Sequence, residues 1–99
     1  MHIILACFAG MSTSLLVKKV EDAAKKRSLD LTIHALPVSS NPSDFENADI
    51  VLLGPQARYM TEELQNNLPN IPIASIPMDV YGSMNGDKIL DLALSIIQK

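Results

Sequence analysis

The chain contains one cysteine and no tryptophan, and only four of its 99 residues are aromatic. A single cysteine excludes an internal disulfide, and with it the disulfide-stapled scaffolds of small secreted proteins. No basic segment or small-residue cleavage site precedes the first apolar run, so nothing there resembles a secretory signal. The reducing cytoplasm is therefore the expected compartment.

Long apolar runs and an excess of basic residues are missing as well. The longest apolar stretch, residues 3–9, is far shorter than the roughly 20 residues that a membrane-spanning helix needs, so we expect no direct membrane insertion. The net charge of −3 argues against a nucleic-acid-binding surface. A basic cluster at residues 18–27 is interrupted by Glu21 and Asp22, which is typical of a solvated helix face; a patch for docking a partner is the alternative interpretation.

The remaining composition is that of an ordinary globular protein. Hydrophobic residues make up 47% of the chain and charged residues 19%. A chain of this length suits one hydrophobic core, so we expect residues 1–99 to form a single domain with one site.

Short apolar runs alternate with amphipathic segments along the chain. Leu16, Val20 and Ala24 recur at helical spacing, with Ser12 or Thr13 as candidate N-cap. Because buried strands joined by crossovers pair in parallel, we expect an α/β fold: a four-stranded parallel sheet with helices on both faces. The predicted strands are 2–8, 31–37, 49–54 and 71–77. The predicted longer helices are 12–27, 87–99 and one that begins at Pro55 and turns Ala57, Met60 and Leu64 inward. A single helical turn is predicted at 43–46, with Ser43 and Glu46 as its capping pair.

Other residues whose side chains are capable of catalysis or metal binding are interpreted as structural. His2 and His34 are expected to be structural or exposed, without an obvious partner, and the five methionines to fill the core. No Cys/His spacing suits zinc, so we expect no metal site.

In an open parallel sheet, ligands bind beyond the carboxyl ends of the strands. Three predicted loops reach that edge: 7–13, 54–56 and 77–86, the last expected to be irregular. The first has the clearest chemistry.

Cys7 ends the first predicted strand, just before a helix N-terminus. Backbone N–H groups there have no intrahelical partners and favour an anion, so the same field should lower the pKa of the Cys7 thiol. Gly10 allows close backbone approach, and the hydroxyls of Ser12, Thr13 and Ser14 suit either phosphate oxygens or helix capping. An inert core cysteine is the alternative interpretation; this placement favours a reactive thiol in a phosphate-binding loop.

Two chemistries fit a thiolate in such a loop. Cysteine phosphatases of the low-molecular-weight class, and arsenate reductases like them, resemble this sequence in their strand-loop-helix layout, and Asp79 in 79-DVYG-82 lies where that class has its general acid. Their arginine, six residues after the cysteine, is Thr13 here. Without that clamp on the phosphoryl oxygens, hydrolysis loses its main electrostatic support, and Asp79 is better read as a turn or capping residue.

The second chemistry is phosphoryl transfer to another acceptor. The segments 7-CFAGMSTS-14, 51-VLLGPQARYM-60 and 81-YGSMNG-86 resemble the IIB component of the bacterial sugar phosphotransferase system, of the lactose, cellobiose and chitobiose class. The resemblance spans nearly the whole chain. It implies that Cys7 is a phosphocysteine without any further cofactor. It also implies a phosphate-binding loop formed by Phe8, Ala9, Gly10, Met11, Ser12 and Thr13.

The resemblance further implies a relay between partners. A phosphohistidine of a IIA component would donate to Cys7, which would pass the phosphoryl group to a sugar, such as cellobiose, chitobiose or lactose, held by the membrane component IIC. Phe8 and Met11 have two alternative roles: contact with a docking partner, or anchoring of the loop in the core. Either support of the phosphate-binding loop or contact with a partner is expected from Ser14, Pro55, Gln56, Asp79 and Tyr81. A monomer is the default state, and a stand-alone regulatory domain that reports phosphorylation is a further alternative.

Overall fold

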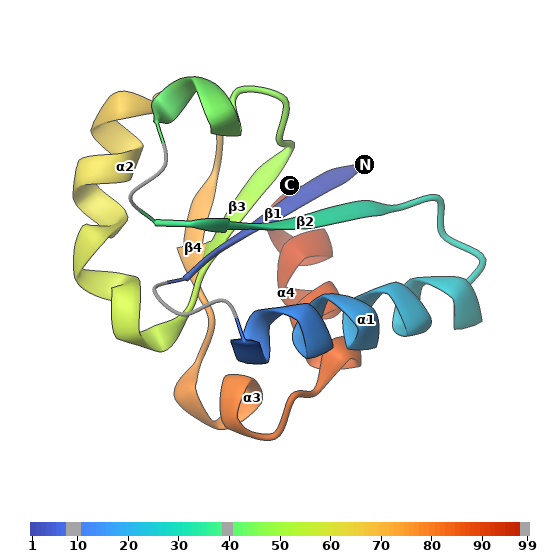
Figure 1. Ribbon diagram of the computed structural model, residues 1–99. Coiled ribbons are helices and arrows are strands. Elements are labelled where there is room, and N and C mark those ends of the chain that lie inside the picture. The colour runs from blue at the N-terminus through green and yellow to red at the C-terminus, as the bar shows by residue number, and fades with distance from the viewer. Residues whose placement is uncertain (8–10, 39–40, 98–99) are drawn as a thin grey trace.

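A single parallel sheet organises the chain, in the strand order β2-β1-β3-β4 (Figure 1). The computed structural model describes residues 1–7, 11–38 and 41–97, without the side chains of Cys7, Met11, Ser12, Thr13 and Pro42. The strands are β1 His2–Cys7, β2 Thr32–Pro37, β3 Ile50–Leu53 and β4 Ile73–Ser75. The four-stranded parallel sheet predicted from the sequence is confirmed, with shorter third and fourth strands than expected.

Helices cover both faces of the sheet, as predicted (Figure 1). One face packs against α1 (Met11–Lys26) and α4 (Gly86–Ile97). The other packs against the short 3-10 helices η1 (Pro42–Phe45) and η2 (Pro55–Met60) and against α2 (Thr61–Asn67). Among the described residues, no helix is long and apolar enough to cross a membrane.

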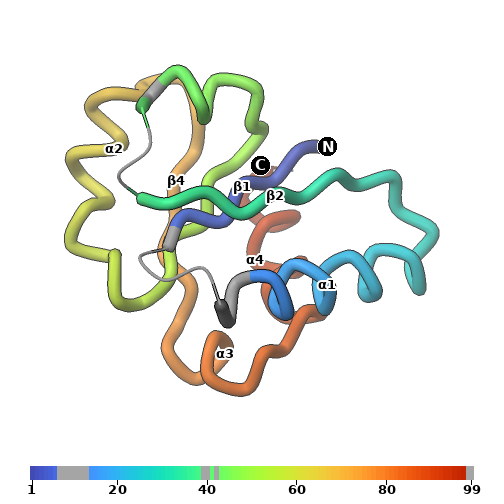
Figure 2. Tube along the Cα trace, viewed as in Figure 1, coloured from blue at the N-terminus to red at the C-terminus, as the bar shows by residue number. Residues whose placement is uncertain are grey.

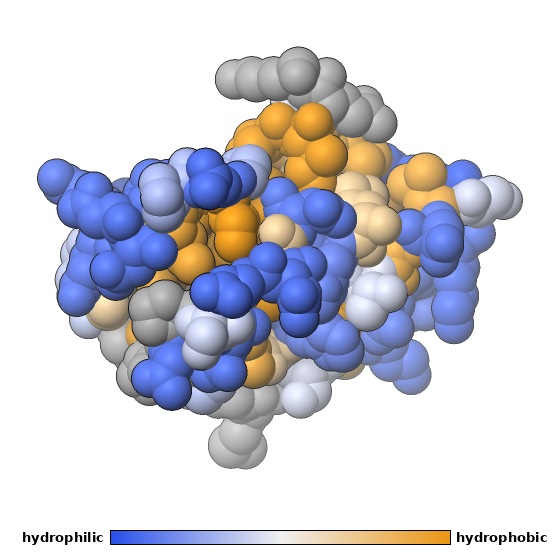
Figure 3. Space-filling view, turned by 90° about the horizontal axis from the view of Figure 1, so that it is seen from above, coloured by the Kyte–Doolittle hydropathy of each residue, from blue (hydrophilic) through white to orange (hydrophobic). Residues whose placement is uncertain are grey.

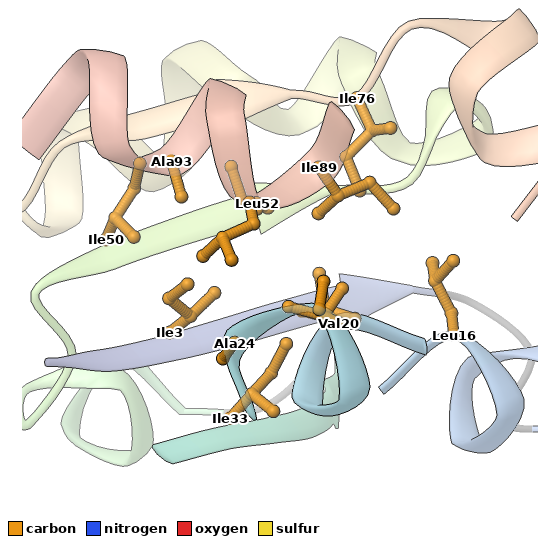
Figure 4. Packing of buried hydrophobic residues seen from close by; sticks show 13 residues of the cluster. Ile3, Leu16, Val20, Ala24, Ile33, Ile50, Leu52, Ile76, Ile89 and Ala93 are labelled. Carbon is orange, nitrogen blue, oxygen red and sulfur yellow. The ribbon is translucent and has the colours of Figure 1, made fainter. Parts of the chain in front are cut away.

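The central strand β1 supplies side chains to both layers because successive strand residues point to opposite faces. Ile3 and Leu5 join the cluster under α1 and α4, whereas Ile4 and Ala6 join the cluster under η1, η2 and α2. All four are almost completely buried. Figure 4 shows Ile3 beside Ile50, Leu52 and the helix residues of the first cluster. Burial of each of the three larger side chains, those of Ile3, Ile4 and Leu5, stabilises the fold by about 1.5 to 3 kcal/mol.

Several local boundaries differ from the sequence predictions. Helix α1 begins at Met11, so Ser12 and Thr13 lie in its first turn instead of capping it. The N-cap of η1 is Asn41, whose backbone N–H donates to Asp44 Oδ2 at 3.2 Å. The predicted capping pair, Ser43 and Glu46, is therefore wrong. The segment expected to be an irregular loop contains a five-residue helix, α3 (Met78–Gly82).

Helices α1 and α4 approach closely where α4 begins. A Cβ atom on Gly86 would overlap the backbone carbonyl of Lys19 and lie 2.9 Å from the backbone nitrogen of Val20. Arg27 directly follows the last residue of α1 and pairs with two carboxylates of α4. It donates to Asp91 Oδ1 at 2.7 Å and lies 3.3 Å from Asp87 Oδ1. The hydrogen bond with Asp91 raises the pKa of Arg27. Part of the basic cluster therefore joins the two helices.

At the amino end of the sheet, His2 connects the start of β1 to the segment before β3. No partner for it was obvious from the sequence. Its backbone N–H donates to Asp49 Oδ2 at 2.7 Å, and its Nδ1 lies 3.1 Å from the carbonyl oxygen of Asn47. Because a carbonyl oxygen only accepts, Nδ1 is the donor in this contact. The His2 and His34 rings meet edge to face with centroids 4.9 Å apart. The expectation that both histidines are structural or exposed is confirmed, and the structure adds the partners that were not obvious from the sequence.

The surface on the side of the molecule opposite α3 mixes hydrophilic and apolar side chains. Figure 3 shows hydrophilic side chains with apolar ones between them, on the side opposite α3. More than half of a folded protein's surface is normally apolar, so such a mixture carries no functional signal by itself.

Candidate functional site

The carboxyl edge of the sheet holds the predicted reactive cysteine. Cys7 is the last residue of β1, opposite Pro37 of β2 in the parallel register. Because β1 lies between β2 and β3, Cys7 sits at the middle of the edge. The expected phosphate-loop residues Phe8, Ala9 and Gly10 lie outside the described residues.

Helix α1 begins at this edge, immediately after that loop. It runs from Met11 to Lys26 and lies beside α4 (Figure 2). Its N-terminal N–H groups therefore belong to the segment that follows Cys7. These groups have no intrahelical partners, and the helix dipole adds positive potential where they lie. The backbone can thus favour an anion near Cys7. Of the hydroxyl side chains predicted to line the loop, Ser14 is exposed, while those of Ser12 and Thr13 are not described.

The second predicted loop is fastened beside the end of β1. Gly54 is buried, and its backbone N–H donates to the carbonyl oxygen of Ala6 at 3.1 Å. Pro55 follows at the first helical position of η2, as predicted, and is half-buried, whereas Gln56 is exposed. This hydrogen bond places the start of η2 next to the residue before Cys7.

The third segment leaves the same edge from β4. The backbone N–H of Ile76 donates to the carbonyl oxygen of Leu53 at 2.8 Å, which holds the chain against β3 before it turns into α3. Asp79 is exposed in the first turn of α3. Tyr81 is half-buried and packs against the cluster under α1 and α4, so it anchors α3 to the body. The tertiary structure therefore brings all three predicted segments to one edge.

Sequence reasoning missed a set of apolar side chains around this edge. Among the described residues, the exposed large hydrophobic side chains are Leu15 in α1, Tyr59 in η2 and Met78 in α3, with 48%, 71% and 76% of their surface accessible. The expectation that all methionines fill the core was wrong for Met78. For Leu15 a signal existed: it lies outside the inward stripe formed by Leu16 and Val20.

Within residues 1–7, 11–38 and 41–97, no group of three or more His, Cys, Asp or Glu side chains is arranged to hold a metal ion.

Comparison with known proteins assigns the chain to a family. Residues 2–92 match the model of the lactose/cellobiose-specific IIB subunit of the phosphotransferase system. The chain belongs to this IIB family. It is 39% identical over 97 residues to the oligo-beta-mannoside-specific EIIB component of Bacillus subtilis, covering 96% of this chain and 94% of the relative. It is also 39% identical over 109 residues to the cellobiose-specific EIIB component of Lactococcus lactis, with the same two coverages.

Solved structures agree with this assignment. The cellobiose-specific IIB component of Borrelia burgdorferi superposes with a TM-score of 0.81 at 39% identity, covering 99% of this chain and 92% of that one. The lactose-specific IIB domain of Streptococcus pneumoniae gives 0.85 at 15% identity, covering 96% and 95%, and so supports the fold alone. The present IIB chain is thus a phosphotransferase component of sugar uptake, a system in which IIB acts with IIA and IIC components.

Proposed function

We propose that Cys7 of this IIB chain carries the phosphoryl group. The observation that supports this most strongly is its position: the chain's one cysteine ends the central strand, directly before the N-terminus of a 16-residue helix. A thiolate is favoured there, and the free N–H groups of the loop and first helical turn suit the oxygens of a bound phosphoryl group. Residues 8–13 form the phosphate-binding loop in this proposal.

The proposed relay has two displacements. In the first, the N–P bond of a phosphohistidine on the IIA component breaks and an S–P bond to Cys7 forms. In the second, a hydroxyl of the sugar bound by the IIC component attacks phosphorus, the S–P bond breaks, and the hydroxyl proton leaves to solvent or a base. No further cofactor is needed, because the covalent phosphocysteine is itself the carrier. The chain would act in the cytoplasm as a monomer that docks transiently.

The sugar is proposed as a β-linked disaccharide, of the kind represented by cellobiose, chitobiose or lactose. Relatives of the chain are named for oligo-beta-mannosides, cellobiose and galactose. In this scheme the membrane component selects the sugar. The residues around the edge either support it or contact partners: Pro55, Gln56, Asp79 and Tyr81. Support is favoured by two structural contacts, the backbone hydrogen bond from Gly54, which precedes Pro55, and the packing of Tyr81.

Phosphatase activity is not expected, because Thr13 stands where the arginine clamp of that class would be. A neutral loop holds the phosphoryl group without strongly stabilising the attack of water.

The decisive experiment incubates the chain with phosphoenolpyruvate, the general phosphotransferase proteins and a IIA component of the same class. We expect one phosphoryl group per chain, mapped by peptide mass spectrometry to Cys7 and lost in Cys7→Ser. Label on His2 or His34, or none, would refute the proposal. Adding membranes that contain a IIC component with its sugar should discharge the label onto sugar; retention of label with every such component would instead support a regulatory domain. Turnover of an aryl phosphate would support a phosphatase.

A further inference from the structure

The turn between α3 and α4 contains an asparagine that is followed by a glycine, Asn85 and Gly86. Every other asparagine of the chain precedes a residue that has a side chain. An Asn-Gly pair is the combination most open to spontaneous deamidation, because glycine has no Cβ to hinder the backbone nitrogen that attacks the asparagine amide. This pair therefore has a covalent chemistry of its own, independent of Cys7.

The reaction of this pair needs only a base and water. The backbone nitrogen of Gly86 loses its proton and attacks Cγ of Asn85, the bond from Cγ to Nδ2 breaks, and ammonia leaves. Water then opens the resulting five-membered imide ring at either of its carbonyls. Attack at Cγ leaves aspartate. Attack at the backbone carbon leaves isoaspartate, in which the main chain runs through the side chain and contains an additional atom.

Three hydrogen bonds hold Asn85 in the folded chain. Its Oδ1 accepts from the backbone N–H of Lys88 at 3.1 Å, the bond that an N-cap side chain makes to a helix. Its backbone carbonyl accepts from the N–H of Ile89 at 3.1 Å, and its own N–H donates to the carbonyl of Val80 at 3.2 Å. Closing the imide ring swings the side chain toward the next peptide unit and turns that unit. The bonds from Lys88 and Ile89 oppose these two movements.

The packing of Gly86 opposes the same rotation of the peptide unit. Gly86 is buried at the start of α4, and a Cβ atom on it would overlap the carbonyl oxygen of Lys19 in α1. One residue later, Asp87 pairs with Arg27 at the end of α1. The start of α4 must therefore separate from α1 before the ring can close, a local opening of the kind by which folded proteins expose single segments.

We propose that Asn85 is the chain's main site of spontaneous deamidation, and that local opening of the start of α4 controls its rate. The two products differ in their effect on the fold. Aspartate keeps an oxygen acceptor for the N–H of Lys88 and adds negative charge at a helix N-terminus, which is favourable. Isoaspartate displaces Gly86 by its additional backbone atom, so it disrupts the close approach of α4 to Lys19.

The first test compares the folded chain with the same chain unfolded in guanidinium chloride, both in one mildly alkaline buffer. Peptide mass spectrometry follows the replacement of NH2 by OH at every asparagine, so the other asparagines are internal controls. We expect Asn85 to react at least about tenfold more slowly in the folded chain than in the unfolded chain, and faster than the other asparagines in both. Equal rates in the two states would refute control by local opening. A faster reaction at another asparagine of the folded chain would refute Asn85 as the main site.

The second test separates the two products by their stability. Asn85→Asp reproduces the aspartate product, and Asn70→Asp makes the same charge change at an exposed position outside α4. Isoaspartate-containing chain is purified by ion exchange from an aged sample and identified with an isoaspartate-specific methyltransferase. In urea unfolding we expect both aspartate variants to match the unaltered chain or exceed it, and the isoaspartate chain to unfold at a lower urea concentration. An isoaspartate chain as stable as Asn85→Asp would overturn the effect proposed for that product.

Discussion

The two ends of the parallel sheet are built differently. At the amino end, His2 joins the start of β1 to the segment before β3 through a backbone bond to Asp49 and a ring bond to Asn47, and its ring packs on His34. At the carboxyl end, backbone bonds from Gly54 and Ile76 hold the chain to the sheet, while Leu15, Tyr59 and Met78 stay exposed. The amino end is held by hydrogen bonds and a ring contact of His2, whereas the connections described at the carboxyl end are backbone hydrogen bonds and the packing of Tyr81.

The largest expected effect comes from Cys7→Ala at the carboxyl end. Phosphoryl transfer from the IIA component should fall to background, because no other thiol is present. The free energy of unfolding should change by less than about 1 kcal/mol, since the register of β1 depends on backbone hydrogen bonds. Urea unfolding and phosphorylation assays on the same preparation check both parts. Loss of stability comparable to a core substitution would show that Cys7 is mainly structural.

A second substitution tests the helices behind the carboxyl end. Gly86→Ala should lower the free energy of unfolding by about 1 to 3 kcal/mol, because the added methyl group collides with the backbone of α1 at Lys19. The matched control is Gly82→Ala in α3, where an added Cβ would meet no atom within 4 Å.

Chemical denaturation of both glycine variants gives the comparison. We expect Gly82→Ala to be close to neutral. Equal destabilisation by the two substitutions would contradict the close approach of α1 and α4 as the cause.

At the amino end, His2→Ala should have the opposite profile to Cys7→Ala. We expect a loss of about 1 to 2 kcal/mol in unfolding free energy, because the carbonyl of Asn47 loses its ring donor and the contact with His34 is removed. The kcat and KM of phosphoryl transfer should stay unchanged at temperatures where the variant is folded. A change in either kinetic constant, with the folded fraction controlled by circular dichroism, would mean that the two ends are coupled.

The smallest effect is expected from His34→Gln. This substitution removes the ring contact but leaves the hydrogen bond from His2 to Asn47, so the unfolding free energy should fall by only about 0.5 kcal/mol. Denaturation of the two single variants and the double variant separates the ring contact from the hydrogen bond. A loss for His34→Gln as large as that for His2→Ala would show that the ring contact, and not the hydrogen bond, closes this end.

Most of the fold could be predicted because its signals are local. The apolar runs that became β1 and β3, and the helical spacing of Leu16, Val20 and Ala24, reflect burial patterns that repeat within one element. The prediction failed where a local signal was ambiguous. Residues 78–86 are rich in turn formers, and a five-residue helix such as α3 is too short to show a periodic pattern.

The partner of His2 was out of reach for a different reason. In the register of β1 and β2, Ile4 lies opposite His34, so His2 and His34 are diagonal neighbours on one face. A shift of one residue would have placed the rings on opposite faces. Sequence alone does not specify that register, because it depends on how the whole sheet packs.

The sequence by itself determined the order of the four strands and of the longer helices, the position of Cys7 at a strand end before a helix, and the absence of the phosphatase arginine at Thr13. These features are properties of short segments and of residue chemistry. Only the tertiary structure decided that β1 is central, that the segments after β1, β3 and β4 meet at one edge, and that Leu15, Tyr59 and Met78 are exposed there. The physical reason is that strand order and packing between layers bring together residues that are distant along the chain, and no local pattern records those distances.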